Sequence, residues 1–503
     1  MRRRERLVLS VVYLLSAKIV LLVLGLATIP FVVHRLGVEA YGLYALVGVL
    51  VGYLSFLDLG TGQALVKHLT EALAHDDALG VQRLVETAAT IFAVSGLVGG
   101  VLVVGLADVL VRRVLYVGPE FAETARLTLR LAGVGFAVTM AQNGLLAVPQ
   151  ACQRLDLVAT LTTVLGVVGL LVPVALLALG AGLPSIVAAG ILINIAGVVV
   201  LVRAFGRLLP GRVLRLGLHR LEAWKLFHFG GATLVGTLAA QVSLQIDKLI
   251  IGALLPLARV SYYAVPFSLA AKLHMIPYAL GPVLFPAVSE VSARGFLQQL
   301  RELYLRTTKI LSATALPLAV FLVVYSDRIL EHWLGPDFAA EGALSLRLLT
   351  SAFFVMLMTQ PATDVARGTG RPEIGAGIAA CDAAAVAALC AVLVPRLGIE
   401  GAALAILVGT GIGSVVFVFV VQVWILKVTA RELLATLLRP ALTSAVYAVI
   451  LCGLRPAATG LLPLVVIATV SLGAYAVATF AFVLDDGERA ALVGASASLL
   501  RSS

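Results

Sequence analysis

The sequence predicts an all-α integral membrane protein with about 14 transmembrane helices, and two observations support this fold class. Of the 503 residues, 61% are hydrophobic and 13% are charged, whereas soluble domains carry about 25% charged residues. The hydrophobic residues form runs of about 20 residues, the length that an α-helix needs to cross a bilayer. Because backbone polar groups must be satisfied internally within the hydrocarbon core, runs of this length favour helices over open strands.

The apolar runs define the expected spans in order along the chain. The first begins directly after MRRRER and has no small-residue cleavage site, so we interpret it as a retained helix rather than a signal peptide. Only the short turn LLPLARVSYY separates the seventh span from the eighth. The fourteen expected spans are residues 7–33, 41–57, 84–111, 127–148, 157–179, 184–205, 228–254, 260–285, 309–326, 342–365, 374–394, 401–426, 440–456 and 461–484.

The distribution of Lys and Arg predicts the orientation, because basic residues are concentrated in cytoplasmic loops. If the N-terminus is cytoplasmic, the loops on that side contain 24 of the 37 Lys and Arg residues, the opposite loops contain 8, and 5 lie inside spans. Both termini are therefore expected in the cytoplasm, with the chain in the cell membrane. The net charge of +10 follows from basic loops that face anionic lipids, so no nucleic-acid partner is expected.

An internal repeat divides the spans into two groups. The stretch LGPDFAAEGALSLRL, which begins at Leu334, repeats VGPEFAETARLTLRL, which begins at Val117, at an offset of 217 residues. The copies precede the tenth and fourth spans, so one period contains six helices and preserves their orientation. We therefore expect two pseudo-symmetric six-helix lobes in residues 1–225 and 226–435, and two C-terminal helices with a short cytoplasmic tail in residues 436–503. In transporters with such repeats, the substrate site lies between the halves.

Several motifs follow one another along most of the chain: RLGVEAYGLYAL, FLDLGTGQALVKHL, QIDKLIIGALL with SYYAV, FPAVSEV, WLGPDFA and ARGTGRP. In their order and spacing they resemble the oligosaccharide flippases of the multidrug/oligosaccharidyl-lipid/polysaccharide exporter superfamily. The resemblance implies two lobes around a central cavity and alternating access. It also implies that a lipid-linked oligosaccharide of the undecaprenyl-pyrophosphate type moves from the cytoplasmic to the outer leaflet, with a polysaccharide polymerase or glycosyltransferases as partner enzymes.

Polar residues at membrane depth are candidates for function because they are costly to insert. The seventh span carries Gln241, Gln245, Asp247 and Lys248 on one face of a helix, and this face is expected to meet water or substrate. The alternative is a polar seam that joins helices through hydrogen bonds. Asp247, and Asp382 in the eleventh span, are the candidates for ion coupling. Asp247 has the alternative of a structural salt bridge, and the Ala-rich surroundings of Asp382 favour close helix packing.

Three lysines come from spans that open the two lobes: Lys18, Lys248 and Lys272. Together they would make a cavity electropositive, as a pyrophosphate-linked glycan requires, because ammonium groups bind phosphate as point charges. The alternative for each is that the side chain reaches toward the membrane interface.

The repeated stretch ends with Arg130 in one copy and Arg347 in the other, which favours a shared architectural role for the two arginines over substrate binding. Further along the same spans, Gln142 and Asn143 correspond to Thr359 and Gln360 at the offset of 217 residues. Gln142, Asn143 and Gln360 are candidates to bind sugar hydroxyls, with hydrogen bonding between helices as the alternative.

The sequence shows no sign of an enzyme. It lacks a Gly-rich phosphate loop, an HExxH zinc motif and a G-x-S-x-G elbow, and its seven His and four Cys residues have no metal-ligand spacing. We therefore expect no catalytic residue, metal or cofactor, and no nucleotide-binding domain to supply energy. A cation-coupled multidrug exporter is the nearest alternative, but it predicts a smaller, more aromatic and more acidic cavity. A membrane glycosyltransferase or polymerase is less favoured.

Overall fold

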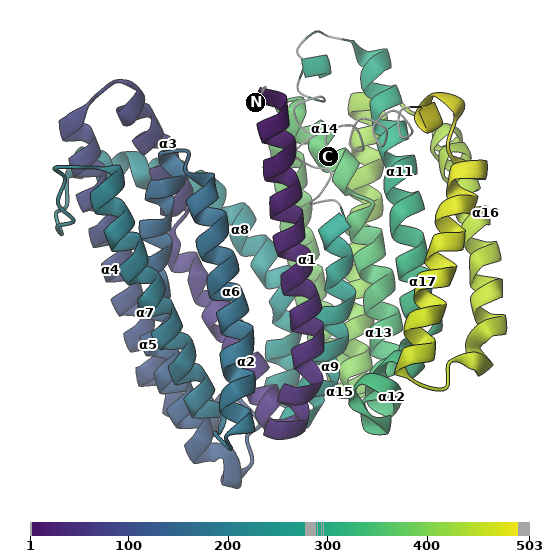
Figure 1. The fold of residues 1–503 in the computed structure, drawn as a ribbon, viewed down its shortest axis with the longest axis horizontal. Coiled ribbons are helices and arrows are strands. Elements are labelled where there is room, and N and C mark those ends of the chain that lie inside the picture. Colours follow the sequence, from purple (N-terminus) through teal and green to yellow (C-terminus); the bar gives the residue numbers. More distant parts are fainter. Residues whose placement is uncertain (1–2, 277–287, 289, 293, 295, 491–503) are drawn as a thin grey trace. The chain divides into compact units, whose positions relative to one another are not determined.

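The computed structural model describes residues 3–276, 288, 290–292, 294 and 296–490, and within them every regular element is a helix (Figure 1). The chain divides into two compact units, Met1–Ser261 and Tyr262–Ser503, called here the N-terminal and C-terminal units. The N-terminal unit thus includes residues 226–261, which the sequence analysis assigned to the second lobe.

The N-terminal unit contains a layer of long helices and one short helix. The helix α5 contacts both α4 and α7, and the short α3 contacts α4, α5 and α8 (Figure 1). The helices are α1 (Arg3–Leu36), α2 (Val38–Leu54), α3 (Thr61–Ala74), α4 (Ala78–Val109), α5 (Ala122–Ala151), α6 (Leu155–Ala178), α7 (Leu183–Leu208) and α8 (Arg220–Leu254).

The C-terminal unit repeats this mixture of long and short helices. Its helices are α11 (Leu297–Val324), α12 (Ser326–Leu334), α13 (Pro336–Leu357), α14 (Gln360–Gly368), α15 (Pro372–Val420), α16 (Ala430–Leu454) and α17 (Leu461–Ala478), while α9 (Leu257–Ala270) begins in the N-terminal unit. Within α15, Gly398 has a non-helical backbone with φ 63° and ψ −140°. Because 49 residues of straight helix would measure about 74 Å, more than twice the hydrocarbon thickness, this break lets α15 turn back.

Eleven segments within the described residues are long and apolar enough to cross a membrane. One of them, Glu373–Leu426, is counted once although it contains the break at Gly398. The chain is therefore an all-α, multi-pass membrane protein. The break lies between the two spans expected at residues 374–394 and 401–426.

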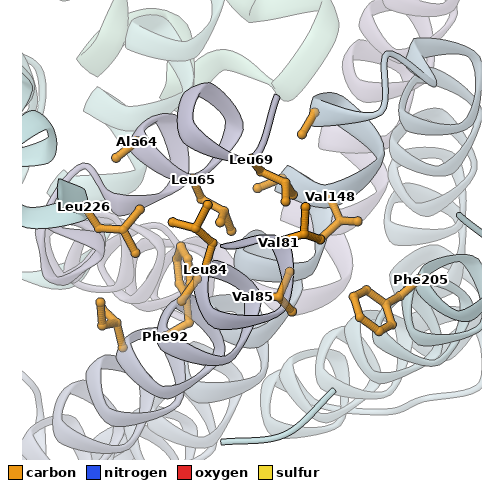
Figure 2. Packing of buried hydrophobic residues seen from close by; sticks show 14 of the residues in the cluster. Ala64, Leu65, Leu69, Val81, Leu84, Val85, Phe92, Val148, Phe205 and Leu226 are labelled. Atoms are coloured by element: carbon orange, nitrogen blue, oxygen red, sulfur yellow. The ribbon is translucent and has the colours of Figure 1, made fainter. Parts of the chain in front are cut away.

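Small residues bring α4 and α5 together. A Cβ atom added at Gly100 would lie 2.9 Å from the carbonyl oxygen of Gly133, and one added at Gly133 would lie 2.7 Å from that of Gly100. Membrane helices use such residues because their association depends on close van der Waals contact. A hydrophobic cluster around α3 continues this packing, with Leu65, Leu69 and Phe92 at most 2% exposed (Figure 2).

The segment that connects α7 to α8, residues 212–219, lies along α4. Gln82 donates a hydrogen bond to the carbonyl oxygen of Val213 (2.7 Å). Glu86 contacts the ring of His219 (2.8 Å). The Thr90 hydroxyl accepts a hydrogen bond from the backbone N–H of Gly217 (2.9 Å). These three side chains are spaced by four residues, which places them on one face of α4. The segment is therefore fixed along one side of the N-terminal unit.

Ion pairs attach the last two helices, α16 and α17, to the rest of the C-terminal unit at both ends of the pair. At one end, Lys309 of α11 contacts Asp485 (2.6 Å) and Glu488 (2.8 Å), which follow α17. At the other, Arg455 contacts Asp327 of α12 at 2.5 Å. These ion pairs fix α16 and α17 against α11 and α12.

Candidate functional site

The motif FLDLGTG forms a sharp turn that leads into α3. A 3-10 turn, η1 (Ser55–Asp58), is followed by Leu59 (φ 54°) and Gly60 (φ 69°), both left-handed, before α3 begins at Thr61. The Asp58 carboxylate accepts hydrogen bonds from the Thr61 hydroxyl (2.8 Å) and from the backbone N–H of Gly62 (3.0 Å). Since the first N–H groups of a helix have no partner within the helix, Asp58 both caps α3 and is held in place by it.

The helix α8 packs against this turn at Gly230. A Cβ atom at this position would overlap the carbonyl oxygen of Leu59 and lie 3.0 Å from the carbonyl carbon of Gly60. Gly60 itself is suited to its positive φ because it has no side chain. The turn therefore depends on glycine at two positions that are distant in sequence.

A cavity of about 350 Å³ opens beside the turn, entirely within the N-terminal unit. This volume is at the lower end of the range for small-molecule sites. Residues 143, 146, 147 and 150 contribute one face of α5, because they follow the spacing of successive helical turns. Its lining residues are Asp58, Gly62, Gln63, Val66, Asn143, Leu146, Ala147 and Gln150.

The lining provides one carboxylate and three amides. Within the described part of the chain, the side-chain amides of Gln63, Asn143 and Gln150 make no hydrogen bond, so each offers both donors and an acceptor. The lining contains no Lys, Arg or aromatic side chain. Such a site disfavours an anion and suits a ligand with many hydroxyl or amide groups.

The cavity lies toward the C-terminal end of α5, because Gln150 is the penultimate residue of that helix. The loop that follows contains Arg154 and belongs to the side that the Lys and Arg distribution predicts to be cytoplasmic. Asn143 is eight residues before the helix end, about 12 Å along the axis. The cavity would then extend inward from the cytoplasmic side.

Two adjacent candidates from the sequence, Gln142 and Asn143, have different environments in the structure. Asn143 lines the cavity, whereas Gln142 packs against Gly197 of α7, with its Nε2 atom 3.2 Å from the position of an added Cβ. The sequence analysis did not identify Asp58, Gln63 or Gln150. The motif FLDLGTGQ contained a signal for Asp58, since glycines two and four residues after an Asp indicate a tight, capped turn.

The lysine candidates have different environments. Lys18 and Lys272 are exposed, whereas Lys248 is 7% exposed and its ammonium group lies 3.3 Å from the Asp247 carboxylate, which is fully buried. Adjacent positions on a helix diverge by 100°, but the flexible Lys side chain bridges this divergence. On the same helix, Gln245 is partly exposed, and the side chain of Gln241 lies outside the described residues.

Two carboxylates in the C-terminal unit occupy helix contacts. Asp382 lies in the first half of α15 against Gly413 of the second half, where an added Cβ would overlap its carboxylate. Asp364, which the sequence analysis did not consider, is 5% exposed and accepts a hydrogen bond from the Gln360 amide (3.1 Å). The candidate Gln360 therefore contacts a buried carboxylate.

The repeated arginines have corresponding partners in the two units. Arg130 contacts Asp108 at the end of α4 (2.9 Å). Arg347 lies 3.7 Å from Asp327 and donates a hydrogen bond to the Ser326 hydroxyl (2.6 Å) at the start of α12. In each unit the arginine thus links the helix after the repeated GP motif to the helix before it.

The family of this chain is shown by its sequence. A family described as polysaccharide biosynthesis protein matches residues 32–340, more than half of the chain. The chain belongs to the polysaccharide biosynthesis protein family. This membership confirms the family resemblance expected from the sequence motifs.

Two relatives of this polysaccharide biosynthesis family member cover most of its length. A protein of Shigella flexneri named "Putative O-antigen transporter" is 21% identical over 383 residues, 76% of this chain and 89% of the relative. A protein of Haloferax volcanii named "Probable flippase AglR" is 23% identical over 395 residues, 77% of this chain and 78% of the relative. Both relatives are named as transporters, in agreement with the expectation that this chain is not an enzyme.

Solved structures confirm that this family member has an all-helical membrane transporter fold. The lipid II flippase MurJ in an inward closed conformation has a TM-score of 0.71 at 13% identity, over 92% of this chain and 98% of MurJ. An inward-facing multidrug resistance MATE family transporter of the MOP superfamily has a TM-score of 0.68 at 11% identity, over 82% of this chain and 97% of the transporter. At these identities the likeness concerns the fold.

Proposed function

We propose that the protein is a flippase that moves a lipid-linked oligosaccharide, of the undecaprenyl-pyrophosphate type, from the cytoplasmic to the outer leaflet of the cell membrane for polysaccharide biosynthesis. The observation that carries the proposal is the cavity lined by Asp58, Gln63, Asn143 and Gln150 in a member of this family. Its hydrogen-bonding groups suit a glycan. The lining has no aromatic residue, which favours the flippase over the multidrug exporter, while the Asp58 carboxylate is an acidic group that both alternatives would share.

We further propose the expected architecture of fourteen spanning helices, with six in each lobe and two at the C-terminus. The eleven apolar segments support this number if α15 is counted as two spans and if α8 and the region that begins with α9 each contribute one more. Fourteen crossings place both termini on one side, which the Lys and Arg distribution identifies as the cytoplasm. The lobes 1–225 and 226–435 then alternate access to the two leaflets.

The charged candidates keep distinct roles in this proposal. Lys18 and Lys272, whose side chains are exposed, would contact the pyrophosphate as point charges, and Lys248 would join them when the transporter changes conformation. Asp247 and Asp382 are the proposed ion-coupling carboxylates, because each unit charge that crosses 100 mV contributes about 2.3 kcal/mol. Membrane lipids surround the protein, and a polymerase or glycosyltransferases would be its partner enzymes.

Reconstitution into liposomes tests the proposed activity. Liposomes that contain the purified protein and a fluorescent undecaprenyl-pyrophosphate disaccharide should expose the sugar to an external, membrane-impermeant lectin or oxidant faster than protein-free liposomes do. An equal rate in both preparations would contradict the proposal. Because purified protein inserts in both directions, the assay measures flipping independently of orientation.

Cysteine labelling in intact cells tests the orientation. Single cysteines that replace Arg212 and Arg367 should react with an impermeant reagent only after the cells are opened, and one that replaces Asp337 should react in intact cells. Labelling of position 212 from outside would reverse the proposed direction of transport.

A further inference from the structure

We infer that the cavity lined by Asp58, Gln63, Asn143 and Gln150 binds a sugar residue of the lipid-linked glycan and not its pyrophosphate. The inference rests on the proposed function and adds to it the part of the substrate that this site recognises. It separates the site from the exposed lysines proposed for the phosphates.

Charge excludes phosphate from this cavity. Asp58 contributes a carboxylate, and the lining contains no basic residue to offset it. The N-terminus of α3 would otherwise attract an anion, but Asp58 already accepts from the Gly62 N–H and the Thr61 hydroxyl there. A pyrophosphate at this position would face the like charge of Asp58 with no basic residue in the lining to offset it.

The same groups match a sugar. A hydroxyl group needs both a donor and an acceptor, and each of the three amides supplies both. The Asp58 carboxylate can accept from a further hydroxyl, and Val66, Leu146 and Ala147 offer an apolar wall for the C–H face of a pyranose ring. Leaving these amides unpaired against an apolar ligand would be costly.

The repeat shows that this wall is specific to the N-terminal unit. At the offset of 217 residues, Asn143 corresponds to Gln360, whose amide is bonded to the buried Asp364 (3.1 Å). The residue that corresponds to Asp364 is Ala147 in the cavity wall. The C-terminal unit thus places an ionisable group where the N-terminal unit has a small apolar one, so the neutral, amide-lined wall occurs in one copy of the repeat.

The test measures binding by the full-length protein in nanodiscs. The probes are undecaprenyl pyrophosphate, alone or bearing N-acetylglucosamine or galactose. The variant is the double substitution Asn143→Ala with Gln150→Ala, and Asn143→Asp provides an isosteric alternative if the double variant does not fold. Asn194→Ala is the control, because Asn194 bonds Thr139 at 3.4 Å and does not line the cavity.

We expect the parent to bind at least one sugar-bearing probe more tightly than undecaprenyl pyrophosphate. The double variant should weaken binding of that probe roughly tenfold, as the loss of two neutral hydrogen bonds predicts, and Asn143→Asp should weaken it severalfold. Binding of undecaprenyl pyrophosphate should change less than twofold in both, and Asn194→Ala should bind all probes like the parent.

Three other outcomes have different meanings. If the parent prefers the sugar-bearing probes and both cavity variants keep that preference, the sugar site lies elsewhere, but the proposed function stands. If the parent binds none of the three probes, the proposed function itself fails, and this inference fails with it. A double variant whose affinity for undecaprenyl pyrophosphate falls by as large a factor as its affinity for the sugar-bearing probe would place the phosphates in this cavity and overturn the inference.

Discussion

Two adjacent glycines in α8 should respond in opposite ways to replacement by alanine. In a helix, Gly→Ala normally stabilises the fold by about 0.5–1 kcal/mol, because the unfolded chain loses conformational freedom. At Gly231, which is exposed and has no other atom within 4 Å of an added Cβ, this gain should be obtained in full.

At Gly230 the added Cβ would overlap the Leu59 carbonyl oxygen and lie 3.0 Å from the carbonyl carbon of Gly60, where ordinary contacts begin at 3.4 Å. The neighbouring atoms belong to the backbone, so they cannot rotate away. Overpacking of this kind costs about 1–3 kcal/mol. After the helix gain is subtracted, Gly230→Ala should destabilise the protein by up to about 2.5 kcal/mol.

Thermal unfolding in detergent, followed by tryptophan fluorescence, measures the difference. For a chain of 503 residues, 1 kcal/mol shifts Tm by about 1 °C, so Gly231→Ala should raise Tm by about 0.5–1 °C and Gly230→Ala should lower it by up to about 2 °C. Because the turn carries Asp58, Gly230→Ala should also weaken binding of the sugar-bearing probe, and Gly231→Ala should leave it unchanged. Equal shifts of Tm with the same sign in both variants would refute the packing of α8 on the turn.

Three further predictions concern the ion pairs. Arg130→Gln and Arg347→Gln should each lower the free energy of unfolding by about 0.2–1 kcal/mol, because these ion pairs are partly exposed. Both variants should preserve flipping. A loss of flipping at normal stability would assign the arginines to the substrate. Lys309→Met should destabilise by about 1.5–3 kcal/mol, since Lys309 contacts the 8% exposed side chain of Glu488; an unchanged Tm would contradict this. In a double-mutant cycle, Asp247→Asn and Lys248→Gln together should destabilise less than the sum of the single changes, and additive effects would rule out a coupled pair.

The Lys309 contact also has a pH signature. Its hydrogen bond to Asp485 is the main cause that lowers the pKa of this carboxyl below its ordinary value of 3.8. A lowered pKa in the folded state stabilises the protein above pH 4 and ceases to do so as pH falls through the folded pKa. As pH falls from 5 to 3, the Lys309→Met variant should therefore lose less free energy of unfolding than the parent does. The difference between the two proteins should be small, because the Asp485 side chain is 62% exposed.

The helical fold could be predicted because the bilayer imposes a simple length rule on hydrophobic runs. The sequence placed a loop between spans at 394 and 401, and the helix breaks there at Gly398. Short elements were harder to predict: α12 and α14 have nine residues each, and their hydrophobic residues merge with those of the neighbouring spans.

The candidate site was only partly predictable, because hydropathy does not give the direction of a side chain. Gln142 and Asn143 are chemically similar neighbours, and only the packing of α5 against α7 determines which of them faces the cavity. The structural salt bridge that the sequence left as an alternative for Asp247 is present, with Lys248 as partner. A helical wheel could not decide between the alternatives, because it positions the Cβ atoms and not the end of a four-carbon side chain.

The two copies of the repeat differ in a way that separates structural from functional residues. At one end of the helices, both units retain an arginine linked to an aspartate of the preceding helix, Arg130 with Asp108 and Arg347 with Asp327. At the other end the copies have diverged, with Asn143 facing a cavity and its counterpart Gln360 bonded to a buried carboxylate. Both units must hold their helices together, so the arginine contact persists in each. A lipid-linked glycan is asymmetric, because it is neutral at its sugars and anionic at its pyrophosphate. Under the proposed function, only one of the two units needs side-chain amides that bind the sugars. Divergence at the end that bears the cavity therefore agrees with the proposed recognition of a lipid-linked glycan.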